Sequence, residues 1–126
     1  MRLTPIKAAI FIAVAVSVTG LTPVSAKDEY QWGSISIDLG GKALDPSYGI
    51  GGADTMDEAI GNAQGFCQKA GGNKCETVVS YKQCGGYAAS PNRWGAGWGA
   101  TKKVAEAAAI LKCSDDRCKI IVSDCN

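Results

Sequence analysis

Short apolar runs with a period of two alternate along this chain with segments that repeat like a helix. Residues 32–37 alternate small or polar side chains with apolar ones, which predicts a strand. Similar runs, separated by glycines and by turns such as Asp45-Pro46, predict strands at 48–52, 76–81, 87–89, 94–99 and 118–123.

Two helices are predicted between these strands. In the first, Thr55 and Glu58 form a capping box, and Ala70-Gly71-Gly72 ends the helix. Its apolar positions fall on one face, which predicts an inner stripe of Met56, Ala59, Ile60, Ala63 and Cys67. The second helix starts at a Thr101 cap and runs to about Cys113, with an inner stripe predicted at Val104, Ala108 and Leu111.

The two halves of the chain are copies of one motif. Tyr48-Gly-Ile-Gly aligns with Trp94-Gly-Ala-Gly at an offset of 46 residues, and this alignment also superimposes two threonines and six alanine or cysteine positions: Thr55 on Thr101, Ala59 on Ala105, Ala63 on Ala109 and Cys67 on Cys113. The copies span about 30–84 and 85–126. The predicted fold is therefore a small disulfide-stapled α+β domain with a duplicated ββαβ motif, an antiparallel or mixed sheet, and both helices on one face.

The first 26 residues have the pattern of a signal peptide. Arg2 and Lys7 precede an uncharged run at 8–21, and Val24-Ser25-Ala26 supplies small residues for cleavage. The run is too short for the ~20 residues that cross a bilayer. We expect a mature domain of residues 27–126 that is secreted or periplasmic.

Charge and composition narrow the functions of this domain. The chain has 13 basic and 12 acidic residues; without Arg2 and Lys7 the balance is 11 to 12, a net charge of −1. Such a domain has no general attraction to nucleic acid or to an anionic membrane. We therefore expect no nucleic-acid partner and no stable membrane anchoring. Histidine is absent, which excludes Ser-His-Asp and Cys-His catalysis, and we expect no cofactor and no metal.

The six cysteines of the mature part predict a disulfide framework. Of fifteen connectivities, ten remain once Cys75–Cys84 and Cys118–Cys125 are excluded, because each of these pairs brackets an extended strand. The repeat and short loop closure favour Cys67–Cys75, Cys113–Cys118 and Cys84–Cys125, the last as a tie between the copies. The other connectivities stay open at this point.

Aromatic and acidic side chains are the candidates for a binding or catalytic site. Trp94 and Trp98 point to the same side of a strand, and Tyr48 and Trp32 match that region in the first copy. Packing in the core is the favoured interpretation, and the alternative is an exposed binding surface of Trp94, Trp98, Arg93 and Tyr48. Asp54, Asp57 and Glu58 suit a helix start, and residues 115–117 suit a solvated turn.

The repeat resembles the bacterial secreted domain-of-unknown-function family DUF4189. The resemblance lies in the Tyr/Trp-Gly-x-Gly strand, the Thr-capped helix that ends in cysteine and the apolar strand between two cysteines. The second copy, from Trp94 to Cys125, carries it best; the first departs from it at Gly52 and in the insert at 38–47. The resemblance implies secretion and a compact cysteine-stabilised domain, and supplies no activity and no catalytic residues.

These observations favour a non-catalytic binding protein whose partner is another protein. An inhibitor, an immunity protein or a secreted effector would act in this way. The alternatives are a cell-wall hydrolase that uses carboxylates such as Asp54, Glu58 or Asp124, and a module that binds cell-wall glycan through Trp94 and Trp98.

Overall fold

The computed structural model describes residues 30–126, so the signal peptide and its cleavage site lie outside the described residues. The elements follow the order ββαβ twice: β1 (Trp32–Asp38), β2 (Tyr48–Ala53), α1 (Met56–Lys69), β3 (Cys75–Tyr81), β4 (Cys84–Ala89), β5 (Trp94–Gly99), α2 (Lys102–Cys113) and β6 (Lys119–Cys125). This order confirms the duplicated α+β motif. Within this part of the chain, no helix combines the length and the apolar character needed to cross a membrane.

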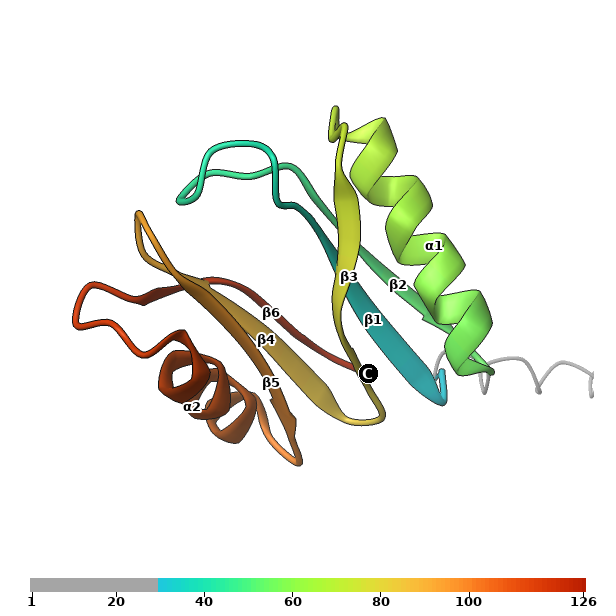
Figure 1. The fold of residues 1–126 in the computed structure, drawn as a ribbon. Helices are drawn as coiled ribbons and strands as arrows, with labels where there is room; N and C mark the ends of the chain where they lie inside the picture. The colour runs from blue at the N-terminus through green and yellow to red at the C-terminus, as the bar shows by residue number, and fades with distance from the viewer. Residues whose placement is uncertain (1–29) are drawn as a thin grey trace, which may run out of the picture.

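The strands divide into two antiparallel three-stranded sheets, one from each half of the chain. Their orders are β2-β1-β3 and β5-β4-β6. The sequence predicts one sheet with both helices on one face. In the structure the two sheets face each other, and each helix covers the outer side of its own sheet (Figure 1). The reason is that the central strands β1 and β4 are buried on both faces. One face receives a helix, and the other needs a second apolar sheet.

A single apolar layer between the two sheets joins the halves. It includes Ile35 and Ile37 from β1, and side chains of similar burial from β3, β4 and β6: Val79, Tyr81, Tyr87, Ala89 and Val122. Tyr81 donates a hydrogen bond of 2.9 Å from its hydroxyl to Asp124 in the other half. Tyr81 pairs with Gly33, the second residue of β1, and Asp124 pairs with Gly85, the second residue of β4. Tyr81 and Asp124 therefore occupy equivalent places in the two sheets.

Each helix lies directly on a glycine-rich strand. A methyl group added at Gly51 of β2 would lie 2.6 Å from the Ala59 carbonyl oxygen, and one at Gly97 of β5 would lie 2.8 Å from the Ala109 nitrogen. Only small side chains fit between backbones this close. The helices therefore bury alanine and cysteine against the sheet, at Ala59, Ala63 and Cys67 in α1 and at Ala105, Ala109 and Cys113 in α2.

This close packing corrects the predicted inner face of α2. Leu111 is 77% exposed and Val104 is 52% exposed, so the prediction is wrong for these two residues. The third predicted residue, Ala108, is half-buried and lies against Gly97 of β5. The glycine strand selects the smallest side chains rather than the most apolar ones. In α1 the predicted Ala59, Ala63 and Cys67 are buried, but Met56 is exposed at the first turn.

The helix starts agree with the sequence. Thr55 caps α1 by accepting a hydrogen bond from the Glu58 nitrogen, and Thr101 caps α2 by accepting one from the Val104 nitrogen; both are 3.2 Å long. The two helices therefore begin at equivalent residues of the repeat.

The disulfides are Cys67–Cys75, Cys113–Cys118 and Cys84–Cys125. The first two fasten the end of each helix to the loop or strand that follows. The third joins the first residue of β4 to the last of β6, within the second sheet. It is therefore not the expected tie between the copies, because Cys84 opens the second half instead of closing the first.

Candidate functional site

The tryptophans of β5 point away from α2, because the glycines of this strand face the helix. Gly95, Gly97 and Gly99 lie under the helix, so the alternate residues point to the other side. Because β5 is an edge strand, this side is only partly covered, and Trp94 is 46% and Trp98 66% exposed. The favoured interpretation of these tryptophans as core residues is therefore wrong.

The predicted surface residues do not form one platform. Trp94 lies with Arg93 in a cleft of about 250 Å³ between the 38–47 insert and the turn at 90–93. Its ring packs against buried Tyr87, with ring centroids 5.7 Å apart. Trp98 lines a different cleft, and Tyr48, 43% exposed, lies apart from both beside Pro46 and Ala70.

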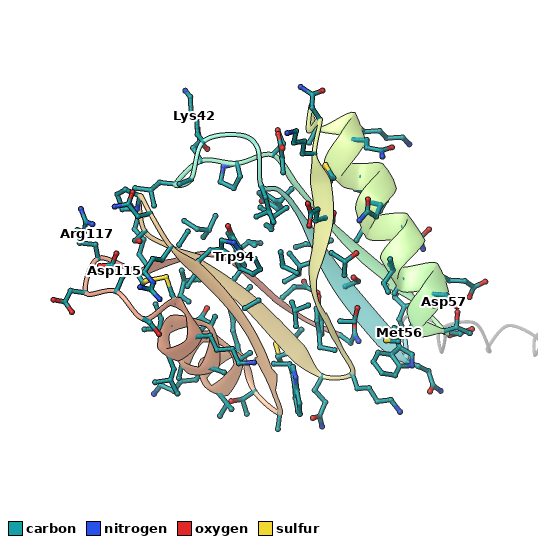
Figure 2. The ribbon with its side chains drawn as sticks, in the orientation of Figure 1. Lys42, Met56, Asp57, Trp94, Asp115 and Arg117 are labelled. Atoms are coloured by element: carbon teal, nitrogen blue, oxygen red, sulfur yellow. A yellow bond between two sulfur atoms is a disulfide. The ribbon has the colours of Figure 1, made fainter. Side chains whose placement is uncertain are left out.

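The cleft lined by Trp98, about 520 Å³, is the strongest candidate for a binding site. Its lining comes from both halves of the chain: Trp32 at the start of β1, Met56 at the start of α1, Tyr81, Lys82 and Gln83 at the β3–β4 hairpin, and Trp98 near the end of β5. Met56 projects at the outer end of this region, next to Asp57 on the first turn of α1 (Figure 2). We call this group of residues the tryptophan cleft.

One wall of the tryptophan cleft lies where the second sheet has a disulfide. Trp32 and Lys82 occupy the places in the first sheet that Cys84 and Cys125 occupy in the second, one residue beyond the pairs Gly33–Tyr81 and Gly85–Asp124. The Lys82 Nζ lies 5.1 Å from the centre of the Trp32 ring, a cation–π contact. The second half is closed here by a covalent bond, and the first half presents an aromatic ring and a cation.

The carboxylates proposed for a hydrolase, Asp54, Glu58 and Asp124, do not come together in one site. Asp124 accepts the hydrogen bond of Tyr81. Burial, and then the charge of Asp124, raise the pKa of the Tyr81 hydroxyl, which stays a donor. Glu58 belongs to the capping box of α1 and lines a shallow depression with Asp54, whereas Asp124 lines a neighbouring one.

Asp115 fastens the 114–118 loop. It accepts hydrogen bonds from the Ser90 hydroxyl at 2.8 Å and from the Arg117 nitrogen at 3.1 Å. The Arg117 guanidinium lies 3.6 Å from the same carboxylate, and Figure 2 shows the two side chains together at this loop. The Arg117 N–H and then the Ser90 hydroxyl lower the pKa of Asp115. Asp116 and Arg117 are exposed, as expected of a solvated turn, whereas Asp115 is half-buried and has a structural role.

Sequence reasoning found part of the tryptophan cleft. Trp98 was singled out, and the repeat matched Trp32 to the same region. Met56 was assigned to the inner helix face, and Gln83 carried no signal of its own. No group of three histidine, cysteine or acidic side chains in residues 30–126 is arranged to hold a metal ion.

Comparisons with known proteins identify a family and no activity. The family described as "Domain of unknown function (DUF4189)" matches residues 32–125, nearly the whole described domain. No curated protein and no solved structure gives a significant match.

Proposed function

Because this chain belongs to the DUF4189 family, which has no assigned activity, we propose a function from its own surface: it is an exported, non-catalytic module that binds a protein partner through the tryptophan cleft. The observation that carries the proposal is Trp98, a large aromatic side chain left 66% exposed at the mouth of an apolar cleft. Exposed aromatic side chains beside such clefts are typical binding hot spots.

The lining favours a protein over a glycan. Trp32, Trp98 and Met56 offer apolar surface. Of the polar side chains, Ser80 and Tyr81 already donate hydrogen bonds within the domain, which leaves Lys82 and Gln83. A glycan needs several hydrogen-bond partners besides an aromatic face. The cleft instead fits a large apolar side chain of a partner, with Lys82 placed to meet a carboxylate beside it.

Export is part of the same proposal. The signal-peptide pattern of residues 1–26 directs the chain out of the cytoplasm, and all six cysteines of the chain are paired. A scaffold held by three disulfides keeps the cleft preorganised, which lowers the entropic cost of binding. Inhibitors, immunity proteins and secreted effectors use rigid surfaces in this way.

The test is capture of the partner with tagged mature protein, followed by affinity measurement with the purified partner. Trp98→Ala should weaken binding by about 30-fold or more, the loss of ~2 kcal/mol expected at a hot spot. Phe66→Ala is the matched control, because Phe66 is 52% exposed but lies on α1, away from the cleft. Equal affinity of the Trp98→Ala and Phe66→Ala variants would contradict the proposal.

Two further assays separate the alternatives. Quenching of tryptophan fluorescence by peptidoglycan fragments, lost in Trp98→Ala, would identify a glycan module instead. Release of soluble fragments from cell walls, lost in Asp54→Ala or Glu58→Ala, would identify a hydrolase.

A further inference from the structure

A second cleft lies at the opposite end of β1 and β5 from the tryptophan cleft. It is the space of about 250 Å³ between the 38–47 insert and the turn at 90–93, and we call it the insert cleft. Trp94, the first residue of β5, lines the insert cleft, whereas Trp98 belongs to the tryptophan cleft. Figure 1 shows the insert and the β4–β5 turn on the same side of the domain.

Both walls of the insert cleft are held by buried polar side chains at equivalent places in the repeat. Asp38 ends β1, and its carboxylate accepts hydrogen bonds from three backbone nitrogens, one in the insert and two before β3. Ser90 follows β4, and its hydroxyl accepts hydrogen bonds from two backbone nitrogens of the turn at 90–93. The cleft is therefore preformed, as small-molecule sites usually are, and the carboxylate of Asp38 is already occupied.

The floor of the insert cleft differs from the matching place in the first half. By the register of the two sheets, Tyr87 stands where the first half has Ile35, and Ala89 stands where it has Ile37. The two isoleucines are completely buried, whereas Tyr87 and Ala89 line the insert cleft. Alanine is smaller than isoleucine and leaves room, and the tyrosine brings a hydroxyl group to a place that is apolar in the first half.

The hydroxyl group of Tyr87 is free. The residue is only 3% exposed, and among residues 30–126 its oxygen has no hydrogen-bond partner, unlike that of Tyr81. It can still be reached from the cleft, since the only fully enclosed side-chain oxygen or nitrogen without a partner in this part of the chain is the Ser36 Oγ. Burial raises the pKa of the Tyr87 hydroxyl, so it is a donor at neutral pH. A buried donor without a partner is costly, and a ligand with an acceptor would remove that cost.

Arg93 supplies a second free donor. Its side chain is exposed, lines the insert cleft and forms no ion pair among residues 30–126. Lys42 is not counted here, because Figure 2 shows its side chain projecting outward from the insert. Free donors of this kind favour an anionic acceptor, and a carboxylate matches the guanidinium group. Next to them the Trp94 ring, 46% exposed, offers apolar surface.

We propose that the insert cleft binds a small organic acid, whose carboxylate accepts hydrogen bonds from Tyr87 and Arg93 and whose apolar group lies on the Trp94 ring. The cleft has the volume of about eight water molecules, which suits an acid with one aromatic ring. A free acid and the carboxyl end of a peptide share this chemistry, and the test separates them. The site is independent of the tryptophan cleft and of the protein partner proposed for it.

Titration of the mature protein with phenylacetate, followed by NMR at the indole N–H groups, tests the proposal. We expect a saturable shift at Trp94 and none at Trp98, with a dissociation constant of about 1 mM or tighter. Phenylacetamide, the uncharged analogue, should bind about tenfold more weakly or worse. Tighter binding of N-acetylphenylalanine than of phenylacetate would identify the carboxyl end of a peptide, and weaker binding a free acid. No saturable shift at Trp94, or equal affinity for phenylacetamide, would overturn the proposal.

Two variants test the donors. Tyr87→Phe keeps the ring and should weaken phenylacetate binding about fivefold or more, and Arg93→Gln about tenfold or more. Lys102→Gln removes the same charge beyond the other end of β5, and should bind as wild type. Because the Tyr87 hydroxyl has no partner in the free protein, Tyr87→Phe should not lower the guanidinium midpoint of unfolding. A lowered midpoint, or wild-type affinity of both cleft variants, would overturn the proposal.

Discussion

The contact between α2 and β5 allows a quantitative prediction for Gly97→Ala. The added methyl group would lie 2.5 Å from the Ala108 Cβ and 2.8 Å from both the Ala108 carbonyl carbon and the Ala109 nitrogen. Two of these three atoms belong to the helix backbone, so no flexible side chain can move aside. Overpacking of this kind costs ~1–3 kcal/mol. A loss of about 2 kcal/mol would lower the melting temperature of a domain of this size by about 8–16 °C.

The same substitution in a helix should have the opposite sign. A methyl group added at Gly61, on the outer face of α1, meets no atom within 4 Å. Gly61→Ala should therefore stabilise the protein by ~0.5–1 kcal/mol, through helix propensity alone. Guanidinium unfolding with the disulfides intact measures both variants. If Gly97→Ala unfolded at the wild-type midpoint, the close approach of α2 to β5 would be refuted.

Three further predictions concern ionisation and the disulfides. Because the pKa of Tyr81 is raised in the fold, the unfolded chain loses this proton first, and stability should fall as the pH rises above about 10; Tyr81→Phe should flatten the fall in guanidinium midpoints. Because the pKa of Asp115 is lowered, its contribution is present above about pH 4 and is lost as the pH falls further, and Asp115→Asn should show a shallower acid loss. Alanine replacement of the Cys84–Cys125 pair, which spans 41 residues, should lower the free energy of unfolding by about 4 kcal/mol. The same replacement of Cys113–Cys118, which spans 5 residues, should lower it by about 2 kcal/mol. Equal losses would contradict the loop-entropy argument.

The repeat made the local fold readable from the sequence. It predicted the order of the elements, and strand 94–99 and the two threonine caps lie where expected. It even contained the correct inner face of α2, because Ala105, Ala109 and Cys113 align with Ala59, Ala63 and Cys67. Apolar periodicity instead placed Leu111 on the inner face. Periodicity ranks side chains by hydrophobicity, and it contains no information about the glycines of the strand that faces the helix.

The arrangement of the halves could not be read in the same way. Alternation along a strand shows which side is apolar, but not whether that side packs on a helix or on a second sheet. The start of β4 was missed for a related reason: Cys84-Gly85-Gly86 has no strand propensity of its own and is held by pairing with β6. The tryptophan cleft depends on this arrangement, since Trp32 and Trp98 come from different sheets.

The hydrogen bond between Tyr81 and Asp124 has a consequence for how such a domain arises by gene duplication. These residues occupy the same position in the two repeats and touch each other. In a dimer of identical single repeats, that position would meet itself, as two phenols or as two mutually repelling carboxylates. Fusion of the repeats into one chain lets one copy supply the donor and the other the acceptor. Once the two halves are in one chain, equivalent positions can carry different residues. The differences between α1 and α2 can arise in the same way.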